Sequence, residues 1–174
     1  IWIGEFGPVF TNDPVRDEDK YRLLSDQLDI YDAHGASWSI WAYKDVGGEG
    51  LVYAAPDSSW IERIKPVIDK KIRLGVDSWG TRDDAIRYIM DPIEETFKKE
   101  YPDFAPFPFG QQGWVQTIVR SILLAEPMVG DFEACFRGID DDETVIALAE
   151  SFSFKNCVRR QKLADLIASK RVDH

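Results

Sequence analysis

The sequence has only two cysteines, Cys135 and Cys157, among its 174 residues. Two cysteines cannot supply the dense disulfide framework of small secreted proteins, and their spacing matches no paired-cysteine zinc motif. We therefore expect two buried free thiols. This pattern favours a reducing, cytoplasmic compartment without excluding secretion.

Long apolar runs and an excess of basic residues are also missing. No segment approaches the length of a membrane-spanning helix, so we expect no membrane span. The 31 acidic residues outnumber the 21 lysines and arginines, which gives a net charge of −10. So negative a chain is a poor partner for nucleic acid, whose phosphates attract cations. The chain starts within an apolar run and without an initiator methionine, so we expect a piece of a longer protein.

The apolar run at the start of the chain, residues 1–10, carries a single carboxylate. Glu5 stands there between Gly4 and Gly7. An unpaired charge is costly to bury, so we expect Glu5 at the end of a strand, facing a polar cleft. The flanking glycines would allow a ligand to approach the backbone closely. The alternative is a strand-end glutamate that caps a loop or pairs with an arginine.

Strand and helix patterns alternate over the first 75 residues. Residues 17–33 repeat apolar side chains every three or four positions, which predicts a helix that ends near His34 and Gly35. Residues 37–43 are rich in aromatic side chains and predict a strand, and residues 60–74 predict another helix. This alternation is typical of a parallel α/β sheet. Two such units cannot close a sheet, so we expect them to belong to a larger one.

The remainder of the chain has helical patterns. We expect helical segments at residues 86–97, 114–136, 141–152 and 156–169. The sequence therefore divides into an α/β part, residues 1–75, and a helical extension, residues 76–174. Arg159 and Arg160 in the last segment fit a solvated face better than a binding patch.

The second predicted strand carries two tryptophans on opposite faces, Trp38 and Trp41. We expect Trp38 in the core. For Trp41, core packing and a flat apolar floor for a sugar ring remain equal alternatives.

Two carboxylates follow that strand. Asp45 can order the next loop through an ion pair with Lys44, or contact substrate. Glu49 stands in a glycine-rich segment, where a solvated loop acid is favoured over a residue that lines the cleft.

The order of these motifs resembles the last two βα units of glycoside hydrolase family 5, the cellulase-type retaining glycosidases. The resemblance rests on Gly-Glu-Phe-Gly at residues 4–7 and Trp-Ser-Ile-Trp at residues 38–41. Segments 43–47, 50–53, 70–80 and 154–160 look like a fungal branch of the family. The resemblance implies the C-terminal portion of a (β/α)8 TIM barrel, in which Glu5 is the catalytic nucleophile. Trp41 would be the platform under the sugar being cleaved.

The implied reaction is hydrolysis of β-linked O-glycosidic bonds in glucan-, mannan- or glycolipid-type substrates, with retention. A carbohydrate is therefore the expected partner, with no cofactor and no metal. The family's acid/base glutamate lies on a strand that this chain lacks, so we expect the isolated chain to be inactive. The alternative is a non-catalytic helical interaction module that retains a vestigial piece of the barrel. The oligomeric state stays open.

Overall fold

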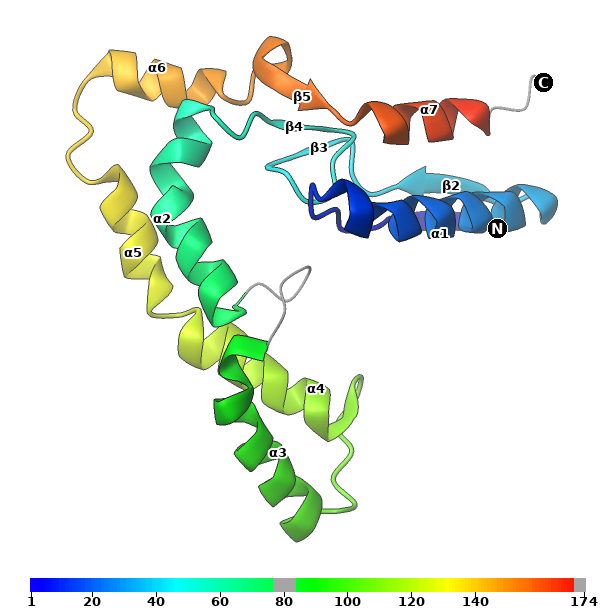
Figure 1. The fold of residues 1–174 in the computed structure, drawn as a ribbon, viewed down its shortest axis with the longest axis vertical. Coiled ribbons are helices and arrows are strands. Elements are labelled where there is room, and N and C mark those ends of the chain that lie inside the picture. Colours follow the sequence, from blue (N-terminus) through cyan, green and yellow to red (C-terminus); the bar gives the residue numbers. More distant parts are fainter. Residues whose placement is uncertain (77–83, 171–174) are drawn as a thin grey trace. The chain divides into compact units, whose positions relative to one another are not determined.

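The computed structural model describes residues 1–76 and 84–170, so part of the family-like segment 70–80 lies outside the described residues. Its elements are shown in Figure 1. Contacts divide the chain into two compact units. Unit 1 contains residues 1–62 and the described residues from Asp141 onward, and unit 2 contains the described residues between Arg63 and Asp140. The division at residue 75 into barrel units and extension stays a prediction.

Unit 1 begins with two parallel strands, β1 (Trp2–Phe6) and β2 (Ser37–Ile40), joined by helix α1 (Pro14–Ala33). Their register pairs the two starts, Trp2 with Ser37, and the two ends, Phe6 with Ile40. A parallel pair requires a long crossover, which α1 supplies. The predicted strand–helix–strand unit is confirmed, although β2 ends at Ile40, before the predicted end at residue 43.

Helix α1 starts at a capped aspartate. The Asp13 side chain accepts hydrogen bonds from the backbone N–H groups of Val15 and Arg16, at 2.9 and 3.3 Å, and proline opens the first turn. His34 caps the C-terminal end as predicted, and Gly35 follows with φ of +61°.

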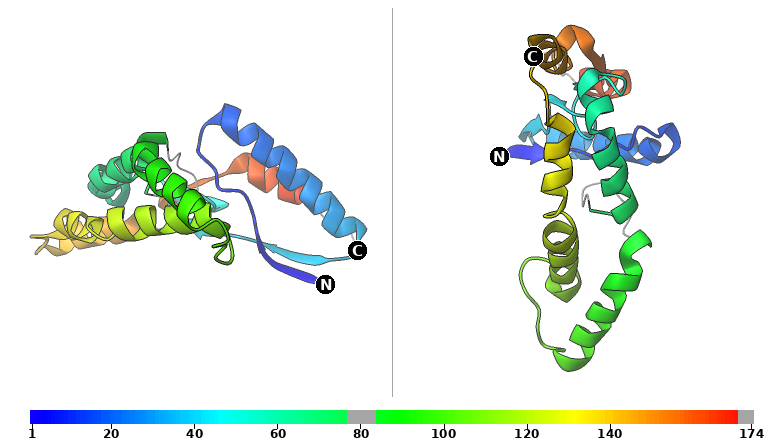
Figure 2. Two further views of the ribbon diagram at one scale, coloured as in Figure 1. Left: turned by 90° about the horizontal axis from the view of Figure 1, so that it is seen from below. Right: turned by 90° about the vertical axis from the view of Figure 1, so that its left-hand side faces the viewer.

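One face of the β1–β2 pair is covered by α1 and by α7 (Gln161–Ser169), as Figure 2 shows. The core between these layers consists of Phe10, Leu24, Leu28 and Leu163, with Phe6, Trp38 and Ile40 packed against it. The predicted core position of Trp38 is therefore confirmed. Its ring meets Phe6 edge to face at 6.0 Å, and its indole N–H donates to Asp32 at 3.1 Å.

A second sheet in unit 1 joins distant parts of the sequence. Strand β4 (Val52–Ala54) pairs in parallel with β3 (Lys44–Asp45) and antiparallel with β5 (Cys157–Arg159). The helix predicted over residues 156–169 is therefore wrong in its first part. Residues 157–159 pair with β4 as a strand, and α7 starts only at Gln161.

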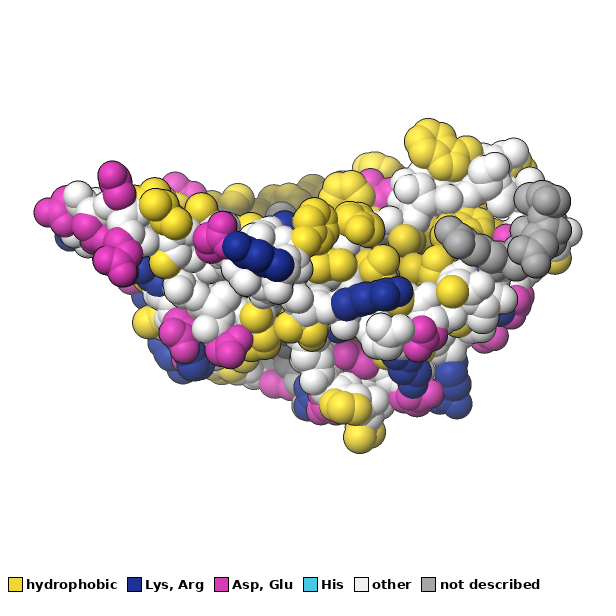
Figure 3. Space-filling model, turned by 90° about the horizontal axis from the view of Figure 1, so that it is seen from above, with side chains coloured by type: hydrophobic (Ala, Val, Ile, Leu, Met, Phe, Trp, Pro, Cys, Tyr) yellow, Lys and Arg dark blue, Asp and Glu magenta, His cyan; other side chains and the backbone are white. Residues whose placement is uncertain are grey.

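The connection to β5 contains α6 (Asp142–Glu150) and the short 3-10 helix η3 (Phe154–Asn156). Asp141 caps α6 by accepting from the Thr144 N–H at 2.7 Å. Acidic side chains gather on the surface where α6 begins (Figure 3). These exposed acids lie at the positive end of the helix dipole, where negative charge is favourable.

Unit 2 is helical where the structure describes it. Its elements are the rest of α2 (Ser59–Leu74), η1 (Asp84–Ile86), α3 (Arg87–Glu100), α4 (Gly110–Gln116), the π-helix η2 (Thr117–Leu124) and α5 (Met128–Phe136). Met90 and Val119 belong to one buried cluster, and Val67 and Met128 belong to another. In the part of the chain that the structure describes, no helix is long and apolar enough to cross a membrane.

Candidate active site

Glu5 and Trp41 lie at the same edge of the β1–β2 pair. Glu5 is the penultimate residue of β1, and Trp41 follows the last residue of β2. The Trp41 backbone N–H donates to the Phe6 carbonyl at 2.7 Å, which holds the two strand ends together. Because the carboxyl ends of parallel strands meet at one edge, an acid and an aromatic residue both stand at that edge.

Both side chains are accessible. The Glu5 side chain is exposed and forms no hydrogen bond or ion pair with any described residue. Trp41 is 52% exposed, so half of this large apolar side chain faces solvent. The peptide bond between Trp41 and Ala42 is cis. An accessible carboxylate and an open indole at one strand edge are suited to a ligand that carries both hydroxyl groups and an apolar C–H face.

Gly7 allows the two strand ends to approach this closely. Its φ is +151°, and a side-chain carbon built on it would lie 2.5 Å from the Trp41 carbonyl oxygen. Any other residue would push the chain after β2 away from β1. The glycine after Glu5 is therefore explained by packing of the backbone against the strand end that carries Trp41.

Asp45 orders the glycine-rich loop, residues 46–50. Its carboxylate accepts hydrogen bonds from the backbone N–H groups of Gly47, Gly48 and Glu49, at 2.8, 3.0 and 2.5 Å. Three bonds to one charged group fix the loop backbone. The predicted Asp45 contact with substrate stays a prediction.

The alternative in which Lys44 orders the loop through an ion pair with Asp45 is wrong. The Lys44 ammonium donates to the Phe152 carbonyl and lies 4.4 Å from the centre of the Phe154 ring. Both partners belong to the C-terminal part of unit 1.

Glu49 has a defined partner in the structure. Its Oε2 accepts a hydrogen bond from the indole Nε1–H of Trp41 at 3.0 Å. The side chain is half-buried, whereas a solvated loop acid was expected. Glu49 therefore orients Trp41, a role that sequence patterns did not reveal because the two residues come together only when the loop folds back.

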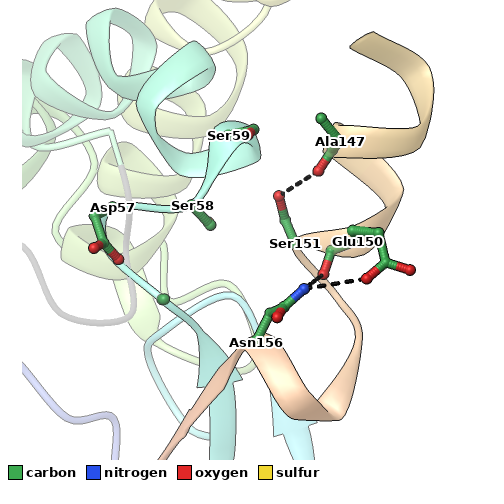
Figure 4. A pocket seen from close by; sticks show the side chains of 8 residues that line it. Asp57, Ser58, Ser59, Ala147, Glu150, Ser151 and Asn156 are labelled. Carbon is green, nitrogen blue, oxygen red and sulfur yellow. Dashed lines mark hydrogen bonds between the residues drawn. The ribbon is translucent and has the colours of Figure 1, made fainter. Parts of the chain in front are cut away.

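A separate polar pocket of unit 1 is shown in Figure 4. It lies between the start of α2 and the end of α6, and it is lined by Ala55, Asp57, Ser58, Ser59, Ala147, Glu150, Ser151 and Asn156. Ser151 accepts from the Trp60 N–H at 3.1 Å and donates to the Ala147 carbonyl at 3.2 Å. The hydrogen bond and charge of Lys155 lower the pKa of Glu150. The Ser151 contacts join the end of α6 to the first turn of α2.

The described residues contain no group of three or more histidine, cysteine, aspartate or glutamate side chains arranged to hold a metal ion. Both cysteines are free thiols, and both are half-buried.

The chain is similar to a protein called β-xylosidase from Phanerodontia chrysosporium. The two are 36% identical over 175 residues, which covers 94% of this chain and 37% of the relative. The chain thus spans little more than a third of the length of this curated relative. No family model and no solved structure matches the sequence. The similarity relates the chain to a glycosidase, and it includes most of the predicted helical extension as well as the α/β part.

Proposed function

We propose that this chain is part of a retaining β-glycosidase, with Glu5 as the nucleophile and Trp41 as the sugar platform. The observation that carries the proposal is the placement of an accessible carboxylate and an accessible indole at one edge of two parallel strands. The sequence similarity to a β-xylosidase supports the same class of reaction. β-Xylosides are therefore the first substrates to test.

The proposed fold of the complete protein is a (β/α)8 barrel of glycoside hydrolase family 5, with β1 and β2 as its last two strands. Their parallel pairing, the helical crossover and the position of Glu5 at a carboxyl end agree with this arrangement, since barrel enzymes keep catalytic groups at that face. In this proposal the first six strands come from sequence outside the chain.

The proposed reaction takes two steps. The Glu5 carboxylate attacks the anomeric carbon and forms a covalent glycosyl-enzyme, while the leaving oxygen takes a proton from a second carboxylic acid. Water activated by that second carboxylate then releases the sugar with retained configuration. Such enzymes separate the two carboxyl groups by roughly 5 Å. We assign the acid/base role to a residue outside this chain, so the isolated chain is expected to be inactive.

The test uses the full-length gene product and 4-nitrophenyl β-xyloside, with the β-glucoside as comparison. Glu5→Gln should reduce kcat at least about a thousandfold and leave the melting temperature nearly unchanged, because the side chain is exposed and nucleophilic catalysis is lost. Glu95→Gln, an exposed acid on α3, is the matched control and should keep full activity.

Azide identifies the role of Glu5 more sharply. In Glu5→Ala, azide can enter the space of the carboxylate, attack the anomeric carbon and expel 4-nitrophenolate. A retaining enzyme should then yield the α-glycosyl azide. Near-normal activity of Glu5→Gln without azide would refute the assignment of Glu5.

The alternative of a non-catalytic helical module gains no support from the comparison with the β-xylosidase.

A further inference from the structure

Arg160 is a buried cation at the end of β5, and only 7% of it is exposed. The prediction of a solvated face at this position is therefore wrong. The guanidinium lies 4.2 Å from the centre of the Phe10 ring and 4.6 Å from that of Tyr53. A guanidinium offers five N–H donors in a rigid plane, and burial requires that they find acceptors.

The acceptors of Arg160 are concentrated on the glycine-rich loop. Its Nη2 donates to the Gly47 carbonyl at 3.0 Å, and its Nε donates to the Gly50 carbonyl at 3.2 Å. Its Nη1 donates to the Asn12 side chain at 2.8 Å. In addition, the Arg160 backbone N–H donates to the Leu51 carbonyl at 2.8 Å. The C-terminal part of unit 1 thus holds a loop more than a hundred residues earlier in the sequence.

Asp45 and Arg160 hold the loop by complementary groups. Asp45 accepts from three backbone N–H groups, and Arg160 donates to two backbone carbonyls. In the sequence, Glu49 stands between Gly47 and Gly50, whose carbonyls Arg160 holds, and its carboxylate accepts a hydrogen bond from the Trp41 indole. Gly50 leaves no room for adjustment, because a side-chain carbon there would lie 2.5 Å from the Val52 carbonyl oxygen and 2.7 Å from the Asp45 nitrogen.

We propose that Arg160 is a positioning residue for Trp41. By fixing the loop backbone it fixes the Glu49 carboxylate, and Glu49 sets the plane of the indole that is half open to solvent. The residue that follows the C-terminal strand β5 thereby contributes to sugar binding without touching the sugar. The contribution to sugar binding rests on the proposed function, whereas the coupling from Arg160 to Trp41 does not.

The coupling is tested by the indole N–H signals of the full-length protein labelled with 15N-tryptophan. Trp41→Phe identifies the Trp41 signal by its loss. Arg160→Lys keeps the charge but loses the planar set of donors, so it should shift or broaden the Trp41 signal. The signal of Trp38, whose indole N–H donates to Asp32, should keep its position. Arg159→Lys, at the exposed neighbouring position, is the matched control and should leave both signals unchanged.

A second variant keeps the test decisive if Arg160→Lys does not fold. Asn12 has φ of +60° and accepts only one of the Arg160 bonds. Asn12→Gly keeps that backbone conformation and removes both the acceptor of the Arg160 Nη1 bond and an Nδ2 donor that reaches the Gly47 carbonyl at 3.3 Å. It loosens one of the two carbonyls that Arg160 holds, so it should shift the Trp41 signal in the same direction by a smaller amount. An unshifted Trp41 signal in folded Arg160→Lys and Asn12→Gly would overturn the proposal. If Arg160→Lys does not fold, Asn12→Gly alone decides.

Kinetics connect the coupling to function. Arg160→Lys and Glu49→Ala should each raise KM about fivefold and change kcat less than about twofold, because a platform binds substrate and transition state alike. The KM of the double variant should be no higher than that of the more impaired single variant, since both substitutions act through one contact. Equal losses in kcat and additive effects would contradict a positioning role. If the wild type hydrolyses no β-glycoside, the proposed function fails, and the tryptophan signals still decide the coupling.

Discussion

Replacement of Asp17 by asparagine should destabilise unit 1 in a pH-dependent manner. Asp17 lies in the first turn of α1 and is only 4% exposed. Its Oδ1 accepts from the backbone N–H and the hydroxyl of Thr11, both at 2.9 Å, and its Oδ2 accepts from the Asn12 N–H at 2.9 Å. The Lys20 ammonium lies 3.2 Å from Oδ1.

Asparagine can reproduce only part of this set. Its amide oxygen can serve Thr11, but its NH2 group would face the Asn12 N–H, so that two donors meet. A buried hydrogen bond to a charged group contributes about 1.5–3 kcal/mol, and the partly exposed Lys20 pair adds less than about 1 kcal/mol. We therefore expect Asp17→Asn to lower the free energy of unfolding by about 2–3 kcal/mol near pH 7. For a chain of this size that corresponds to about 4–12 °C in melting temperature.

The pH dependence gives the prediction its sharpest test. Burial raises the pKa of Asp17, but the Thr11 hydrogen bonds and Lys20 together outweigh burial and hold the pKa below 3.8. A carboxyl with a lowered folded pKa contributes stability above the unfolded value, and this contribution is lost as pH falls through the folded pKa. The difference in free energy of unfolding between wild type and Asp17→Asn should therefore have its full size at pH 5–7 and decrease below about pH 4.

The assay is thermal unfolding followed by tryptophan fluorescence at several pH values, with exposed Asp19→Asn on the same helix as control. A gap of the same size at pH 3 and pH 7 would refute the electrostatic reasoning. So would equal stability of Asp17→Asn and Asp19→Asn at pH 7.

Two further substitutions test packing by thermal unfolding. Gly7→Ala should cost more than about 2 kcal/mol, because its side-chain carbon would lie 2.5 Å from the Trp41 carbonyl oxygen; Gly35→Ala, with φ of +61° and no atom within 4 Å, should cost only about 1–2 kcal/mol. Equal costs in free energy of unfolding would contradict the close approach of the strand ends. In unit 2, the Oε1 of the buried Glu94 has no hydrogen-bond partner among the described residues and lies 3.6 Å from the Arg87 Nη1. Arg87 is partly exposed and keeps Asp91 as a partner at 3.1 Å, so Glu94→Leu removes a buried charge without stranding another and should raise stability by about 1 kcal/mol. A loss of stability there, measured against exposed Glu95→Leu, would show that the ion pair stabilises the fold.

The sequence by itself located the elements whose signals are local. The apolar spacing of α1, with Leu24 and Leu28 fully buried, and its end at His34 and Gly35 follow from neighbours within two turns. The motif around Glu5 and the tryptophan after the second strand were also visible, because each consists of adjacent residues.

Only the tertiary structure decided which distant groups meet. Residues 157–159 have no local reason to prefer a strand to the start of α7; pairing with β4 decides it. That pairing also buries Arg160, since it brings the guanidinium against carbonyls of a loop 110 and 113 residues away. The hydrogen bond from Trp41 to Glu49 depends in turn on how that loop folds back. Burial and long-range hydrogen bonds depend on how the whole chain packs, whereas helical periodicity and capping depend on residues that are neighbours in the sequence.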